Sequence, residues 1–232
     1  MNMTDAEYFS GAATFGPVAV RLSRTETETL CFKAARGAGH SWGIAEEAAT
    51  AVGWLCAQGL DGTSALLAAI VAPTFVGPAA ADGQWTAQEG RGLCPLLTGT
   101  TLADFAGTDA GPFTAETVIG PVHQPVLLLP FLSQCAEVLN AAVQVTWGQR
   151  TLVVGRTIMA EPADISALAN AAVATITVSL AQQEETAAAP VPFASALPHT
   201  LAALNALALR TTVPATEESR NSGAGAGTSD ND

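Results

Sequence analysis

The side chains with the clearest potential for chemistry lie in a glycine-rich segment at 34–43, which reads Ala-Ala-Arg-Gly-Ala-Gly-His-Ser-Trp-Gly. Within it, His40 is a candidate general base or hydrogen-bond donor, because imidazole titrates close to neutral pH. Glu46 and Glu47 follow closely enough to act with it as catalytic residues. His40 and Ser41 are not expected to form a nucleophile–base pair, since adjacent side chains diverge. The alternative interpretation is a plain structural turn without a ligand.

The same segment has features of an anion site at the start of a helix. Backbone N–H groups at a helix N-terminus attract anions, and glycines let a ligand approach the backbone closely. The predicted anion-binding residues either belong to this turn or supply a guanidinium that could converge on it: Arg36, Gly37, Gly39, Ser41, Arg91 and Arg220. The alternative is a solvated or ion-paired arginine in each case, and a helix N-cap for Ser41.

Two further groups of residues are weaker candidates. The tail at 213–232 carries carboxylates that could ligate Mg²⁺ or Ca²⁺, with a solvated tail as the alternative. His123, set between prolines, either faces a pocket or caps a buried turn. Histidines and cysteines lack the paired spacing of a structural zinc site, so no metal is predicted. The sequence names no cofactor.

Charge and composition exclude some partners and favour others. Nine basic residues face 21 acidic ones, for a formal charge of −12, so nucleic acid and anionic membranes are not expected partners. Hydrophobic residues make up 49% of the chain and charged residues only 13%. A monomer of this composition exposes much apolar surface, which predicts a homo-oligomer or a subunit of a heteromeric complex. The composition is also compatible with a small-molecule ligand.

The cysteines and the hydropathy pattern favour a cytoplasmic protein. The longest uncharged run, at 62–81, is interrupted by Pro73 and Pro78, which argues against a membrane span. The N-terminus lacks the pattern of a signal peptide. Widely spaced cysteines are expected to be reduced and buried in a core; they are Cys31, Cys56, Cys94 and Cys135.

Capping signals predict a helical hairpin around the glycine-rich segment. Ser23 and Glu26 form a capping box, which begins a helix that Gly37 is expected to terminate. Ser41 is expected to cap a second helix that ends at Gly59. A third, shorter helix is predicted from residue 61 or 63 to the residue before Pro73.

The rest of the chain predicts an α+β fold, with the helical hairpin packed on a mixed β-sheet and with long Gly/Pro-rich loops. Residues 72–124 are expected to form long loops with a few short elements, and 182–192 a linker. Strands are predicted at 126–129, 143–147, 151–154 and 175–180, and helices at 131–139, 165–172 and 197–209. The expected organisation is a loose lead-in at 1–16, a single domain at 17–212 and a Gly-rich acidic tail at 213–232.

Two resemblances to known families add to what the residues imply. Residues 33–48, 125–131 and 213–232 together resemble an uncharacterised bacterial family catalogued as a domain of unknown function, which implies no activity and no catalytic residue. Residues 22–64 are similar to the N-terminal helices of the malate/L-lactate dehydrogenase family that lacks a Rossmann fold. That family places a catalytic histidine after its serine, whereas Ala65 follows Ser64 here. Neither dehydrogenase activity nor a nicotinamide cofactor is therefore expected.

The functional expectation is an enzyme, or an enzyme subunit, that acts on a small carboxylate-bearing metabolite. The alternative is a non-catalytic partner that assembles or stabilises another enzyme through its apolar surface. A pocket that joins His40 to an arginine favours the first, and a flat apolar face favours the second.

Overall fold

The computed structural model describes residues 19–72, 76–81, 83–87, 91–109, 111–182, 191 and 193–212. The predicted lead-in and tail, including Arg220, lie outside these residues. The described helices are α1 Arg24–Gly37, α2 Trp42–Ala57, α3 Gly62–Val71, α4 Pro95–Phe105, α5 Leu129–Leu139, α6 Pro162–Ala169 and α7 Pro198–Ala208, with 3₁₀ turns η2 Pro125–Leu128 and η3 Leu209–Thr211. The strands are β1 Val20–Ser23, β2 Ala79–Ala81, β3 Gln84–Thr86, β4 Thr117–His123, β5 Ala142–Trp147, β6 Arg150–Val154, β7 Ile158–Met159, β8 Val173–Ala181 and β9 Phe193–Ala196.

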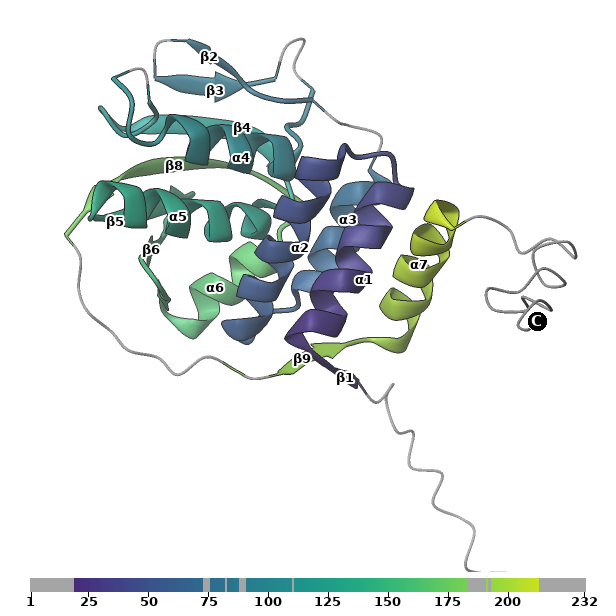
Figure 1. Ribbon diagram of the computed structural model, residues 1–232. Coiled ribbons are helices and arrows are strands. Elements are labelled where there is room, and N and C mark those ends of the chain that lie inside the picture. Colours follow the sequence, from purple (N-terminus) through teal and green to yellow (C-terminus); the bar gives the residue numbers. More distant parts are fainter. Residues whose placement is uncertain are drawn as a thin grey trace, which may run out of the picture.

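The strands form one large mixed sheet and one small separate sheet. The large sheet has seven strands in the order β2-β3-β4-β8-β5-β6-β7, and the small sheet pairs β1 with β9. Only β3 and β4 run parallel in the described sheets. Figure 1 shows α4 and α5 against the large sheet, with α1, α2, α3 and α7 gathered beside it. The predicted α+β class is therefore confirmed.

The first helix begins and ends where its sequence predicts. The Ser23 hydroxyl accepts from the Glu26 N–H, and the Glu26 carboxylate accepts from the Ser23 N–H, which completes the capping box. Gly37 is the last residue of α1, as expected, and the chain reverses two residues later at Gly39, which has φ +102°. The physical reason for Gly37 is packing: a Cβ there would lie 1.8 Å from the Leu207 carbonyl oxygen.

The starts of α2 and α3 differ in how their backbone N–H groups are satisfied. Ser41 occupies the N-cap position of α2, but contrary to expectation its hydroxyl makes no capping hydrogen bond. Asp61 caps α3 through its carboxylate, which accepts from the Ser64 N–H at 3.0 Å. Gly59 follows the end of α2 with φ +78°, as its position in the sequence predicts.

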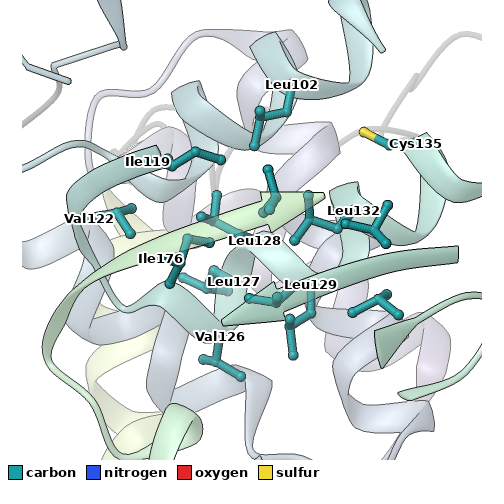
Figure 2. Packing of buried hydrophobic residues seen from close by; sticks show 14 of the residues in the cluster. Leu102, Ile119, Val122, Val126, Leu127, Leu128, Leu129, Leu132, Cys135 and Ile176 are labelled. Atoms are coloured by element: carbon teal, nitrogen blue, oxygen red, sulfur yellow. The ribbon is translucent and has the colours of Figure 1, made fainter. Parts of the chain in front are cut away.

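The hydrophobic core has two parts with different side chains. The sheet core lies between the large sheet, α4, α5 and η2, and is built from large aliphatic residues such as Leu127, Leu132 and Ile176. Figure 2 shows this cluster at close range. The helix core lies among α1, α2, α3 and α7, and is built mainly from small residues: Cys31, Ala34, Ala35, Ala45, Ala48, Cys56 and Ala194, with Val52, Leu66, Ile70, Cys94, Leu96, Leu204 and Leu207.

One expectation about the middle of the chain was wrong, and another did not specify the elements that are present. Residues 126–129 were predicted as a buried strand, but they form η2 and the first residue of α5. A short apolar run has no period that separates a strand from a buried helical turn. Residues 72–124 were predicted as long loops with a few short elements; the elements that they contain are β2, β3, α4 and β4, of which α4 is a helix of 11 residues. In α4, glycine is required at position 99 because a Cβ there would lie 2.1 Å from the Phe131 ring.

The later elements follow their sequence patterns closely. The predicted hairpin is β5 and β6, which pair from Val143↔Val154 to Trp147↔Arg150 around the turn at Gly148. The predicted strand at 175–180 lies within β8, which pairs with both β4 and β5. The helix predicted at 165–172 begins three residues earlier, as α6. The final helix is α7.

Candidate functional site

The side chains of the glycine-rich turn bind one another. An Arg36 N–H group donates to the His40 carbonyl oxygen, and the Arg36 guanidinium carbon lies 5.6 Å from the centroid of the Trp42 ring. The Trp42 indole N–H donates to a Glu46 carboxylate oxygen at 2.8 Å. Phe32 meets the Trp42 ring edge-on, with centroids 5.1 Å apart. Together these contacts fix the path of the chain from α1 into α2.

His40 is buried at the base of this turn, with 5% of its surface exposed. Burial lowers the pKa of its imidazole, so the ring is neutral at physiological pH. Cavities of about 190 to 300 Å³ in the described part of the chain include four that are not lined by His40, Arg36 or Arg91. A catalytic role for His40 therefore stays a prediction.

The remaining predicted site residues are spread over the molecule. Glu46 lines an open groove of about 300 Å³ between α1 and α2, whereas Glu47, the next residue of α2, is half-buried. Arg91 is exposed and precedes Gly92, which lies under the ring of His123 beside β4. Arg220 lies outside the described residues. The structure thus brings Arg36, His40 and Glu46 together but places Arg91 in another region.

A cavity with a different character lies at the other end of the α1–α2 hairpin. Its volume is about 240 Å³, and its walls are mostly apolar. We name it the Arg24 cavity. The residues that line it are Arg24, Thr27, Gly53, Cys56, Ala57, Val191, Phe193 and Ala194. Because α1 has 14 residues, this cavity lies about 20 Å from the glycine turn along the helix axis.

Segments distant in the sequence close the Arg24 cavity. Strand β9 pairs antiparallel with β1, which sets Phe193 opposite Ser23 at the start of α1. The Val191 N–H donates to the Ala57 carbonyl at the end of α2, at 2.8 Å. Figure 1 shows β1 and β9 side by side at the foot of α1, near the lower end of α2. The cavity therefore needs both the N-terminal hairpin and the segment around β9.

One arginine lines this cavity, and a second stacks on a phenylalanine of its wall. Arg24 lines it, and its Nε donates to Glu28 at 2.6 Å. A guanidinium has four further N–H donors, so this ion pair does not exhaust its capacity. Arg21 stacks over Phe193, with its guanidinium carbon 4.3 Å from the ring centroid. The nearby Glu26 carboxylate is turned to Ser23, whose hydrogen bonds lower the pKa of that carboxyl.

The thiol in the cavity wall is poorly suited to nucleophilic attack. Burial raises the pKa of Cys56 to about 11, and backbone hydrogen bonds from Gly62 and Thr63 oppose the shift only in part. Burial also raises the pKa of Cys31 on the facing helix. Since the thiolate is the reactive form, Cys56 at neutral pH behaves as a small apolar wall residue. All four cysteines are buried and free, as the sequence predicts.

Sequence reasoning did not find this site because its parts have no common motif. Arg24 follows the N-cap of a predicted helix, and Phe193 lies about 170 residues farther along the chain. The signal that the sequence did carry was the spacing of Arg21 and Arg24, two of only nine basic residues, on either side of the capping serine. Such a pair concentrates positive charge at one point of an acidic protein.

Searches for metal sites and membrane helices gave negative results for the described residues. No group of three or more His, Cys, Asp or Glu side chains in them could hold a metal ion. Within the same part of the chain, every helix is too short or too polar to cross a bilayer.

A comparison with known protein families gave a match to the N-terminal part of the chain. Residues 22–105 match the family model "Protein of unknown function (DUF3726)". This match supports the resemblance to an uncharacterised family and covers α1 to α4. Neither the curated proteins nor the solved structures gave a significant match.

Proposed function

We propose that this protein binds a small metabolite with an apolar body and one carboxylate in the Arg24 cavity. The observation that carries the proposal is an arginine beside an apolar cavity on a chain of formal charge −12. An arginine is the natural receptor for a carboxylate, because its planar N–H groups match the two carboxylate oxygens. Apolar walls favour a ligand whose remaining surface is aliphatic or aromatic.

The polar and apolar parts of the cavity are arranged for such a ligand. Arg24 is exposed on the first turn of α1, whereas Thr27 and Ala194 are buried. A carboxylate on Arg24 therefore keeps contact with water while the apolar body enters between α1, α2 and β9. Glu28 holds the guanidinium in place through the Nε bond.

The raised pKa of Cys56 agrees with a cavity that binds a ligand and argues against thiolate chemistry there. The proposal includes catalysis on the bound metabolite, either by this chain or by an enzyme of which this chain is a subunit. The catalytic roles suggested for His40, Glu46 and Glu47 belong to a different surface, about 20 Å away along α1. Any reaction that combines the two regions would need a ligand or partner that spans that distance.

The test uses isovalerate as a branched carboxylate and isovaleramide as its uncharged analogue. Isothermal titration calorimetry on the full chain should show isovalerate binding that is about tenfold or more tighter than isovaleramide binding, because the amide cannot form the charge-assisted pair. Arg24→Gln should remove this preference. Ala57→Leu should block both probes by filling the cavity, whereas Ala57→Ser should leave binding unchanged.

Matched arginine variants decide between this cavity and the glycine turn. Arg36→Gln and Arg91→Gln remove the same charge from the two positions that the sequence predicts as anion-binding. Both should retain isovalerate binding. Loss of binding in either variant, with Arg24→Gln unaffected, would assign carboxylate recognition to the predicted residues and overturn the Arg24 cavity.

Assembly with a second copy or with another protein is the competing function. Large apolar side chains are exposed at Trp42, Val71 and Val138, with exposed fractions of 61%, 61% and 66%. These residues lie on three different helices, so they do not by themselves define one interface. Mass measurement by light scattering at micromolar concentration tests the predicted oligomer, and a monodisperse 23.5 kDa particle would contradict it.

A further inference from the structure

A second cavity lies on the other side of the connection between α2 and α3. Its volume is about 260 Å³, and it is bounded by the start of α3, the turn from β4 into η2 and the end of α6. Leu55 and Val126 form part of its buried wall. The polar side chains that line it are Asp61, Ser64, Gln124 and Asn170. We name it the Asp61 cavity.

The polar side chains of this cavity are held by bonds that leave acceptor atoms available. One Asp61 carboxylate oxygen accepts from the Ser64 N–H at 3.0 Å and from the Thr63 hydroxyl at 2.8 Å. The Asn170 amide nitrogen donates to the Ser166 carbonyl at 2.9 Å, which leaves its amide oxygen and its second N–H for a ligand.

The other two polar residues are also fixed by the fold. The Ser64 hydroxyl lies 3.0 Å from the Thr200 hydroxyl of α7. Gln124 has a left-handed backbone with φ 45°, and its N–H donates to the Ala172 carbonyl at 2.9 Å. This backbone shape turns the chain from β4 into η2, so the Gln124 side chain lines the cavity from the side opposite α3.

The charge of the Asp61 cavity is opposite to that of the Arg24 cavity. Asp61 is the one ionisable residue among those that line it, and no lysine, arginine or histidine is among them. The start of α3 does not attract an anion here, since the Asp61 carboxylate already caps it. A ligand that donates hydrogen bonds and carries positive charge matches this lining better than an anion does, and its apolar part could pack on Leu55 and Val126.

We propose that the Asp61 cavity binds a small organic ammonium ion, with the ammonium group on Asp61 and Asn170 and the alkyl group against the buried wall. Asp61 and Asn170 are exposed at the mouth, whereas Leu55 and Val126 are buried. This order of polar mouth and apolar floor matches a primary amine with a short alkyl chain. The site is separate from the proposed carboxylate site and does not depend on it.

The test uses 3-methylbutylamine and the neutral 3-methylbutanol with the full-length protein at pH 7.5. The amine should bind, by calorimetry, about tenfold to a hundredfold more tightly than the alcohol, since a hydrogen bond to a charged group is the larger contribution. Asp61→Asn should abolish this preference while α3 stays capped, because asparagine is as good an N-cap as aspartate. Ala169→Leu should block both probes by filling the cavity.

Two controls separate this site from general attraction to an acidic protein. Asp104→Asn removes one exposed carboxylate from α4, outside the cavity, and should leave amine binding unchanged. Arg24→Gln should also leave it unchanged, which keeps this test independent of the carboxylate proposal. Absence of amine binding, an equal loss in Asp104→Asn, or full binding in Ala169→Leu would each overturn the inference.

Discussion

At the glycine-turn end of the α1–α2 hairpin, Arg36, Trp42 and Glu46 bind one another, whereas at the other end Arg24 lies beside an apolar cavity. The first end is closed by residues within ten positions of each other in the sequence. The second end is completed by β9 and Val191, which come from far along the chain. Polar side chains that lie close together in the sequence can thus use their hydrogen-bonding groups on one another. The cavity forms instead where segments distant in the sequence meet.

The largest expected effect concerns the packing of Gly37 at the closed end. Gly37→Val should destabilise the protein by about 3 kcal/mol or more, because the new side chain would collide with the backbone of α7 at Leu207. Gly43→Ala is the matched control, since nothing lies within 4 Å of a Cβ there. The control should keep or slightly raise stability in urea unfolding. Equal losses in both variants would show that the turn, and not the α7 contact, requires glycine.

The next largest effect concerns the thiol at the open end. The pKa of Cys56 is raised in the folded protein, so its contribution to stability is fully present below about pH 9 and is lost as pH rises through about 11. A shift of this size corresponds to about 3 kcal/mol. Urea unfolding between pH 8 and 11 should show this loss, and Cys56→Ala should reduce its slope. An unchanged slope in that variant would assign the alkaline loss to the other buried cysteines.

The two capping serines offer a direct comparison of the helix starts. Ser23→Ala should cost about 1 kcal/mol, because it removes a reciprocal capping box. Ser41→Ala should change the free energy of unfolding little, since the Ser41 hydroxyl makes no capping bond. Chemical denaturation of the two variants under the same conditions checks this order. A larger cost for Ser41 would mean that its hydroxyl has a role that this geometry does not explain.

The smallest expected effect concerns His40 and appears only as a pH dependence. Because burial lowers the pKa of His40, the stability that depends on its neutral ring is present above about pH 6.5 and is lost as pH falls. His40→Gln, which cannot gain a proton in this range, should flatten the stability profile between pH 7 and pH 5. A profile parallel to that of the unmodified protein would remove His40 as the source.

The predictable parts of the fold are those with local physical causes. The Ser23–Glu26 capping box, the start of a helix after Asp61 and the turn at Gly148 are each specified by a few adjacent residues, and all three are confirmed. Helix α4 was missed because threonines and a glycine interrupt its apolar positions, and that glycine, Gly99, is explained only by Phe131, which is not a neighbour in sequence.

The candidate site was less predictable than the fold for the same reason. A sequence shows that His40, Arg36 and Glu46 lie close together, but it does not show that Arg36 and Glu46 bind other residues of the same turn. It also shows Arg24 only as the residue after an N-cap. The pairing of β1 with β9, which brings Phe193 to Arg24, depends on how the whole chain folds.

The completion of the helix core by α7 and β9 affects how the protein can fold during synthesis. Helices α1 to α3 leave the ribosome first, but Ala194, Leu204 and Leu207 of their core are encoded more than a hundred residues later. At about 5–20 residues per second, these partners are synthesised about 6 to 27 seconds after the end of α3, and until then the alanine and cysteine faces of the helices are uncovered. Residues 22–105, the stretch that matches a family model, would therefore be a nascent segment with an incomplete core. A ribosome that stalls before Pro198 would expose that apolar surface to chaperones and proteases.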